Sequence, residues 1–268
     1  MMIKMIFTDM DGTLLDDRSE LPPDFEEAVG RLKEKGVKFA PSSGRQYFSL
    51  LKSFDKYKDD FVFVAENGAI AFYKGEEIAS FPMDKDAAVD ILNSPEDEST
   101  DRVFCGKHHA FILKPQDTEI FQNEVRKYFS FYKKVDRFDE ADDTPIKLSF
   151  FDPEGKAKTR ILPHVKKYEK DYTVVNSSDC WVDITAKGVS KGRTIEEIQK
   201  RFGVYKEECA AFGDYLNDME MLDAVGYGYA MENAVDELKK RAKFIAPANS
   251  DYGVTRTIKQ LLDEGFMG

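Results

Sequence analysis

Two aspartates near the start of the chain, Asp9 and Asp11, stand in the pattern D-x-D-G-T. The apolar residues 3–7 directly before them predict a buried strand. In an open parallel α/β sheet, ligands bind just beyond the carboxyl ends of the strands. A pair of carboxylates at such a position can hold a hard cation and can perform nucleophilic or acid–base chemistry. This segment is therefore the first candidate for a catalytic site.

Three further polar clusters each follow a predicted strand. They are Ser42-Ser43-Gly44 after strand 37–41, Glu66-Asn67-Gly68 after strand 61–65, and Gly213-Asp214 after strand 209–212. Because the carboxyl ends of parallel strands open on one edge of a sheet, clusters far apart in the sequence should converge there. This expected convergence is stronger evidence for a site than any one cluster.

Each of these clusters also has an ordinary structural interpretation. Ser43 could bind an anion together with free N–H groups at a helix start, or it could simply cap that helix. Asp214 and Asp218, on either side of Asn217, could be the acidic residues that helix N-termini favour. However, four carboxylates and an amide around one point would repel one another strongly without a cation, and an all-oxygen donor set favours Mg²⁺. The sequence thus predicts a magnesium site formed by Asp9, Asp11, Asp214 and Asp218.

Strands and helices alternate at both ends of the chain, whereas the middle has a different order of elements. Residues 1–82 and 187–268 predict one doubly wound, Rossmann-like parallel sheet of the α/β class. Residues 83–186 predict an inserted α+β domain with the element order αββαβαββ, because insertion at a loop is tolerated where the loop ends are close together. Within this insertion, residues 93–101 and the acidic stretch 136–143 are expected to be exposed loops.

The composition excludes several classes of protein. The 268 residues carry a formal net charge of -11, which argues against nucleic acid or an anionic membrane as a partner. No apolar run approaches the ~20 residues of a membrane helix, and no signal peptide is evident. The three cysteines have no metal-binding spacing and suit a reducing cytoplasm. His108, His109 and His164 are expected to be structural or surface residues.

The clusters and their order resemble the haloacid dehalogenase (HAD) superfamily of phosphohydrolases, and most closely its Cof-type sugar-phosphatase branch. The resemblance covers essentially the whole chain. It includes the four polar clusters, a large α/β cap inserted between the second and the third of the family's motifs, and two segments near the end of the chain, Met231-Glu232-Asn233-Ala234 and Asn249-Ser250-Asp251-Tyr252-Gly253-Val254. Tyr215 stands where the branch often has a small residue, and its ring could narrow the entrance or simply pack.

The resemblance implies a role for each candidate residue. Asp9 is the nucleophile that forms an aspartyl-phosphate, and Asp11 is the general acid and then the base. Lys191, which by itself would be read as a solvated lysine at a helix start, neutralises charge between nucleophile and phosphate. Asp214 binds Mg²⁺ with Asp9 and the Asp11 carbonyl, and Asp218 supports this metal site. The residues expected to bind substrate are Ser43, Gly44, Arg45, Asn67 and Asn217.

The expected function is hydrolysis of a small phosphorylated metabolite by a Mg²⁺-dependent cytoplasmic phosphatase. The family favours a sugar phosphate, and nucleotide-like or cofactor phosphates remain open. Two alternatives are a phosphomutase, which needs a bisphosphorylated intermediate, and a binding protein that has lost turnover. Every expected motif position is filled, which argues against the binding protein. The chain is expected to be a monomer or a homodimer without nucleic-acid or membrane partners.

Overall fold

The computed structural model describes residues 2–94, 100–116 and 118–267. These residues form two compact units. Unit 1 consists of residues 1–43, 54–79 and 190–268, and unit 2 of residues 44–53 and 80–189, apart from the residues outside the described ranges.

The centre of unit 1 is a five-stranded parallel sheet with the strand order β14-β13-β12-β1-β2. The first strand lies next to β12, with Thr8 opposite Phe212, so segments from both ends of the chain meet in the middle of the sheet. The predicted doubly wound core is therefore confirmed. The strand bounds are β1 Met5–Thr8, β2 Lys38–Pro41, β12 Cys209–Gly213, β13 Tyr227–Met231 and β14 Phe244–Ala246.

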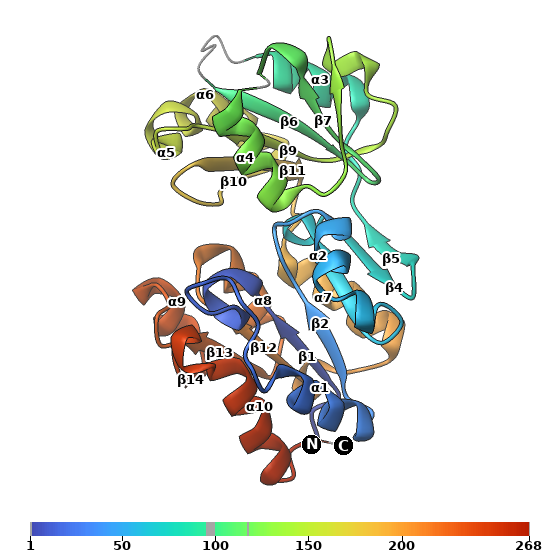
Figure 1. Cartoon of the computed structure of the whole chain (residues 1–268), viewed down its shortest axis with the longest axis vertical. Helices are drawn as coiled ribbons and strands as arrows, with labels where there is room; N and C mark the ends of the chain where they lie inside the picture. Colours follow the sequence, from blue (N-terminus) through green and yellow to red (C-terminus); the bar gives the residue numbers. More distant parts are fainter. Residues whose placement is uncertain (1, 95–99, 117, 268) are drawn as a thin grey trace. The chain divides into compact units, whose positions relative to one another are not determined.

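Helices cover both faces of this sheet (Figure 1). Right-handed crossovers place the helix after β1 on one face and the helices after β12 and β13 on the other, because the chain moves in opposite directions from the centre of the sheet. α1 packs against α10, and α7 packs against α8. The bounds are α1 Phe25–Glu34, α7 Lys191–Phe202, α8 Met219–Asp223, α9 Asp236–Arg241 and α10 Gly253–Asp263.

The third predicted strand lies in a small antiparallel sheet beside the parallel one. β3 (Val62–Ala65) pairs with β4 (Ile70–Tyr73), and a single parallel bridge between Ser42 and Val64 joins β3 to the end of β2. A hairpin turn at Lys74 and Gly75 connects β4 to β5 (Glu76–Ser80). Both turn residues have positive φ, as a type I′ hairpin turn requires.

Unit 2 contains a six-stranded sheet with the order β10-β11-β9-β6-β7-β8. Alternate residues of β9 point to opposite faces: Leu148 belongs to the apolar core beneath α3, α5 and α6, and Phe151 to the core beneath α4. The bounds are α3 Lys85–Asn93, β6 Asp101–Gly106, β7 Ala110–Leu113, α4 Glu119–Tyr128, β8 Tyr132–Val135, β9 Pro145–Phe151, α5 Ala157–Arg160, α6 Leu162–Val165, β10 Tyr172–Asn176 and β11 Trp181–Ala186.

The predicted order αββαβαββ for this domain omits one strand. Helix α4 ends at Tyr128, and β8 follows and pairs in parallel with β7 at the edge of the sheet. Lys133 and Lys134 in this strand are exposed. Charged residues are typical of edge strands. Because of these lysines, β8 lacks the apolar pattern by which a strand is predicted from the sequence.

Helix α2 (Tyr47–Ser53) belongs to unit 2, whereas the domain boundaries expected from the sequence place it with the core. The Ser49 hydroxyl donates to the Tyr128 carbonyl over 2.9 Å, and Gln46 exchanges two hydrogen bonds of 3.1 Å with the backbone of Phe131. These bonds join α2 to the end of α4, a connection between residues some eighty positions apart that no local pattern encodes.

The acidic stretch 136–143 is not entirely the solvated loop that its composition suggests. Phe138 is buried, and the Asp143 side chain is only 5% exposed. The Asp143 carboxylate accepts hydrogen bonds from the backbone N–H groups of His108, His109 and Thr144, each over 2.8 Å. Backbone N–H groups that lack a strand partner need an acceptor, and this aspartate provides it. The predicted structural role of His108 and His109 agrees with these contacts.

Asp101, at the start of β6, should destabilise the protein at neutral pH. Its burial raises the pKa to about 6, although the Arg102 guanidinium acts in the opposite direction. A folded-state pKa above the unfolded value means that the group's contribution is favourable at low pH and is lost as the pH rises through about 6. We expect Asp101→Asn to raise the free energy of unfolding by ~1 kcal/mol near neutral pH, after allowance for partial solvent screening.

Thermal unfolding across the acidic to neutral range tests this expectation, because the gain should shrink as the pH falls toward the unfolded pKa of about 4. Asp142→Asn is the matched control, since the Lys133 ammonium lowers the pKa of Asp142 and its replacement should bring no gain. A pH-independent effect of Asp101→Asn would contradict the interpretation.

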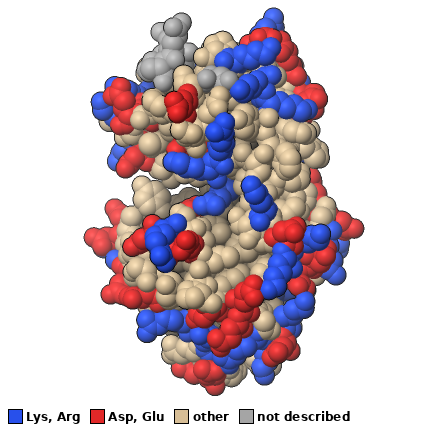
Figure 2. All heavy atoms as spheres, in the orientation of Figure 1, with Lys and Arg blue, Asp and Glu red and all other residues tan. Residues whose placement is uncertain are grey.

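On the face drawn in Figure 2, cationic and anionic side chains are interspersed and form no single acidic field. No helix within the described residues is long and apolar enough to cross a membrane. Residues 95–99, the main part of the loop predicted at 93–101, lie outside the described residues.

Candidate active site

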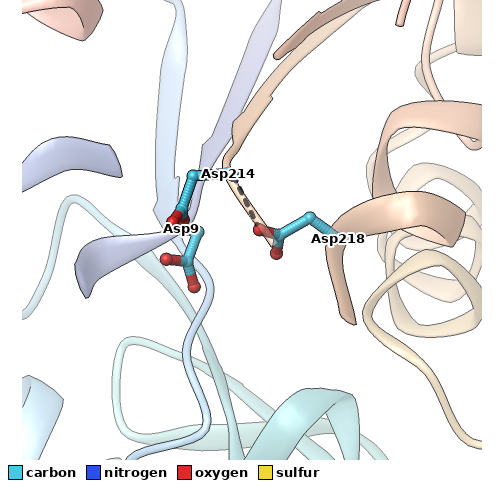
Figure 3. A group of neighbouring side chains, drawn as sticks. All are labelled: Asp9, Asp214 and Asp218. Atoms are coloured by element: carbon cyan, nitrogen blue, oxygen red, sulfur yellow. Dashed lines mark hydrogen bonds between the residues drawn. The ribbon is translucent and has the colours of Figure 1, made fainter. Parts of the chain in front are cut away.

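Three aspartates from two neighbouring strand ends meet at the carboxyl edge of the parallel sheet. Asp9 follows β1, Asp214 follows the adjacent β12, and Asp218 closes the short turn η8 (Leu216–Asp218). Each offers a carboxylate oxygen, and these oxygens lie within 4.8 Å of one another. Figure 3 shows the Asp218 side chain pointing toward Asp9 and Asp214. The expected convergence of clusters some 200 residues apart is present in unit 1.

Asp218 uses its two carboxylate oxygens for different purposes. Oδ2 accepts hydrogen bonds from the backbone N–H groups of Asp214 and Tyr215, over 3.0 and 3.2 Å, and the first of these is drawn in Figure 3. Oδ1 accepts from the Lys191 ammonium over 2.6 Å. Both interpretations of this acid therefore apply: it satisfies the backbone at the start of a helix, and it belongs to the charged cluster.

Lys191 is completely buried between two carboxylates. Its Nζ lies 2.5 Å from Asp9 Oδ1 and 2.6 Å from Asp218 Oδ1, and none of its side chain is exposed. The residue begins α7, whose N-cap Ser190 accepts a hydrogen bond from the N–H of Arg193. A lysine at a helix start is ordinarily solvated, but here the tertiary structure places it inside the cluster.

A glycine allows α7 to approach the sheet closely enough for this contact. Gly68 has a φ of +90°, and a Cβ built there would lie 2.5 Å from the Ser190 carbonyl oxygen and 2.8 Å from the Lys191 nitrogen. The Thr194 hydroxyl also donates to the Gly68 carbonyl. The Glu66-Asn67-Gly68 cluster thus positions the helix that carries Lys191.

Three predicted substrate-binding residues lie near one another in unit 1. The Asn67 backbone N–H donates to the Ser43 carbonyl over 3.0 Å, and the Asn217 side chain donates to Asn67 Oδ1 over 3.3 Å. Asn67 itself has a left-handed conformation with φ of +56°. Gly44 and Arg45 follow Ser43 in the chain and belong to unit 2. The binding roles of all five residues remain predictions.

The turn after β1, η1 (Met10–Leu14), contains Asp11, which is exposed, and Thr13, which is buried. The Thr13 hydroxyl donates to Asp214 Oδ1 over 2.8 Å and so orients that carboxylate. Thr13 is not among the site residues predicted from the sequence, although it is the hydroxyl residue of the D-x-D-G-T pattern. Gly12, with φ of +79°, leaves room for this arrangement, since a Cβ there would lie 2.5 Å from Asp214 Oδ2.

The cluster holds more negative than positive charge. Burial raises the pKa of Asp9 well above its usual range, with repulsion from Asp218 and Asp214 adding to the effect and the Lys191 ammonium opposing it. Burial and the negative charge of Asp218 likewise raise the pKa of Asp214 to about 6. Burial alone would lower the pKa of Lys191, but the attraction of Asp218 and Asp9 outweighs it and raises that pKa.

This charge imbalance is what a bound divalent cation would correct. One ammonium cannot offset three carboxylates, of which Asp9 and Asp218 are buried and Asp214 is half-buried, and a cation beside them would restore their ordinary acidity. The available donors are all oxygen atoms without histidine or thiolate, a set that suits Mg²⁺ better than zinc or copper. The residues present therefore fit a magnesium ion.

Comparison with known proteins agrees with this fold and this cluster. A family model described as haloacid dehalogenase-like hydrolase matches residues 6–258. The chain accordingly belongs to the haloacid dehalogenase-like hydrolases. Its homologues are named phosphatases, and the chain is a HAD-type phosphatase that acts on phosphorylated metabolites.

Three similar proteins illustrate the relationship. The chain is 30% identical over 272 residues to the 5-amino-6-(5-phospho-D-ribitylamino)uracil phosphatase YbjI of Escherichia coli, with 98% of this chain and 97% of that protein covered. A haloacid dehalogenase-like hydrolase from Bacillus subtilis has a TM-score of 0.85 at 26% identity, covering 97% and 100%. A HAD subclass IIB sugar phosphatase has a TM-score of 0.79 at 25% identity, covering 96% and 98%. The recognised resemblance to the Cof-type branch is thereby confirmed.

Proposed function

We propose that the protein is a Mg²⁺-dependent phosphomonoesterase that hydrolyses a small sugar or polyol phosphate through an aspartyl-phosphate on Asp9. The observation that carries this proposal is the cluster of Asp9, Asp214 and Asp218, with the buried Lys191 ammonium between Asp9 and Asp218. A phosphoryl group in transfer carries negative charge on its equatorial oxygens, so catalysis depends mainly on positioning and on positive charge near them.

In the first half of the reaction, a carboxylate oxygen of Asp9 attacks phosphorus and the bond to the ester oxygen breaks. Asp11 gives a proton to the departing alkoxide, so that the leaving group departs as a neutral alcohol. Lys191, hydrogen-bonded to Asp9, holds the nucleophile in place and supplies one positive charge beside it. Ser43 and the Gly44 N–H would bind phosphoryl oxygens, and Arg45 would bind the substrate. Asn217, supported by Asn67, would orient it.

In the second half, water attacks phosphorus and the bond between phosphorus and the Asp9 oxygen breaks. Asp11 accepts the proton of that water, which restores both aspartates and releases inorganic phosphate. Asp9, Asp214 and the Asp11 carbonyl would hold Mg²⁺, with support from Asp218. When bound, this ion would supply positive charge to the phosphoryl oxygens and to the crowded carboxylates.

The names of two relatives support the proposed substrate class. One relative is named for a phosphate ester of a ribityl chain and another is named a sugar phosphatase. Both leaving groups are polyhydroxy alcohols, and we infer that this chain takes a leaving group of the same class. We propose that residues 83–186 form the cap and that this cap selects the leaving group. The cysteines, none of which forms a disulfide, suit the proposed cytoplasmic location.

Removal of metal should abolish turnover. We expect the protein to release phosphate from p-nitrophenyl phosphate and from a panel of sugar and polyol phosphates in the presence of Mg²⁺, and to lose this activity reversibly on addition of EDTA. Phosphate release is measured by a colorimetric assay, and added Mg²⁺ should restore it. Activity that is unaffected by EDTA, or no release from any panel member, would contradict the proposal. Turnover that requires a sugar bisphosphate activator would instead indicate a phosphomutase.

A further inference from the structure

Two asparagines near the end of the chain contact the loop that carries the proposed catalytic aspartates. Asn233 follows β13, and Asn249 begins the turn η9 (Asn249–Asp251) after β14. Both belong to the segments by which the chain resembles its family, yet neither has a place in the proposed chemistry. All of their contacts described below lie within unit 1.

The two side chains form one continuous hydrogen-bonded path between two carbonyls of the loop. Asn233 Nδ2 donates to the Gly12 carbonyl over 2.8 Å. Asn233 Oδ1 accepts from the Asn249 backbone N–H over 3.0 Å. Asn249 Nδ2 donates to the Leu15 carbonyl over 3.0 Å and to Asp17 Oδ1 over 3.1 Å. The segment 12–17 is thus held at both ends by amide groups from a distant part of the sequence.

The same C-terminal segment also contacts the second acidic loop. The backbone N–H of Val235 donates to the Asp214 carbonyl over 3.0 Å. Residues 233–235 therefore connect the loop of Asp11 and Gly12 with the loop of Asp214. These two loops supply the carboxylates that must keep a fixed separation if they are to share one cation.

The contact at Gly12 bears on the orientation of Asp11. Gly12 has a left-handed φ of +79°, and this angle contributes to the position of the peptide that follows it. Because glycine is flexible, it does not maintain this conformation without a further contact. Because successive peptide planes share an α-carbon, fixing the Gly12 carbonyl also restricts the preceding peptide, which contains the Asp11 carbonyl. That carbonyl is one of the proposed ligands of Mg²⁺.

We propose that Asn233 and Asn249 are positioning residues that hold the Asp11–Gly12 peptide in the orientation needed for Mg²⁺ binding and for proton transfer by Asp11. The inference rests on the proposed function. It assigns to these asparagines an effect on metal affinity and on kcat that exceeds any effect on folding.

The decisive variant is Asn233→Ala, because Asn233 is exposed and its loss should leave the fold intact. Removal of a group that orients a metal ligand typically weakens metal affinity or activity by about 10- to 100-fold. We expect a loss of that size in Mg²⁺ affinity, measured on the protein alone by isothermal titration calorimetry, and a similar loss in kcat. The KM for p-nitrophenyl phosphate and the melting temperature should change little.

Asn249→Ala and the double variant test whether the two side chains act together. Because they belong to one path, the double variant should lose little more than the more damaging single variant. Asn123→Ala, at an exposed position of α4, is the matched control and should retain wild-type values.

Wild-type Mg²⁺ affinity and kcat in Asn233→Ala would overturn the inference while leaving the phosphatase proposal intact. A lowered melting temperature with normal Mg²⁺ affinity would also overturn it, since it would show a purely structural role. A wild-type protein that neither binds Mg²⁺ nor releases phosphate would overturn both proposals.

Discussion

Asp9→Asn should abolish phosphate release while the protein remains folded. An amide oxygen is a poor nucleophile toward phosphorus, and loss of a nucleophile can cost on the order of 10⁶-fold in kcat. We expect a decrease of at least about 10³-fold, limited by the background of the assay. The substitution preserves the shape of the side chain and removes one of three crowded carboxylates, so it should not unfold the site.

Hydrolysis of p-nitrophenyl phosphate at saturating Mg²⁺ measures this effect, and circular dichroism confirms the fold. Asp55→Asn, an exposed position in unit 1, is the matched control and should have wild-type activity. If Asp9→Asn retained more than a few per cent of wild-type kcat, Asp9 could not be the nucleophile, and another group in the cluster would have to attack.

Replacement of Lys191 should damage both stability and catalysis. Lys191→Met keeps the apolar stem and removes the ammonium that lies between Asp9 and Asp218. Breaking a buried ion pair by deleting one partner typically costs ~3–5 kcal/mol, because the remaining charge is left uncompensated. Loss of a charge that stabilises a transition state typically lowers kcat by about 10²- to 10³-fold.

Urea denaturation gives the change in the free energy of unfolding, and kcat is measured under conditions where the variant is folded. Lys200→Met on the same helix is the control, because Lys200 and its partner Glu197 are exposed and such pairs contribute less than about 1 kcal/mol. A Lys191→Met variant as stable as Lys200→Met would show that the cluster tolerates the loss of its ammonium. Full activity in Lys191→Met would exclude a role in charge neutralisation.

The sequence alone identifies Asp9 as a candidate site residue, but it does not predict the buried position of Lys191. Asp9 can be recognised from a short pattern. The apolar residues 3–7 predict a buried strand, and the D-x-D-G-T residues that follow predict the carboxyl edge of the sheet. The helix of Lys191 is also predictable, because Ser190 caps its start and Gly203 ends it in the left-handed conformation. The burial of Lys191 is not predictable from that helix, since most lysines at helix starts are solvated.

Contacts between distant parts of the chain also decided two features of the fold that local patterns do not show. The strand β8 carries two exposed lysines and derives its structure from pairing with β7. Helix α2 has an ordinary helical pattern, but its hydrogen bonds to Tyr128 and Phe131 place it in unit 2. In both cases the deciding contact joins the element to another part of the fold.

The sequence by itself determined the class of the fold, the carboxyl-edge position of the acidic clusters and an oxygen donor set suited to Mg²⁺. These properties depend on local periodicity, on turn residues and on residue type, all of which are written in short segments. Only the tertiary structure decided that Thr13 orients Asp214, that Lys191 lies between Asp9 and Asp218, and that Asn233 and Asn249 hold the Asp11 loop. Each of these contacts except the one between Lys191 and Asp218 joins residues about 180 or more positions apart, and the groups in contact meet only after the sheet has brought both ends of the chain together.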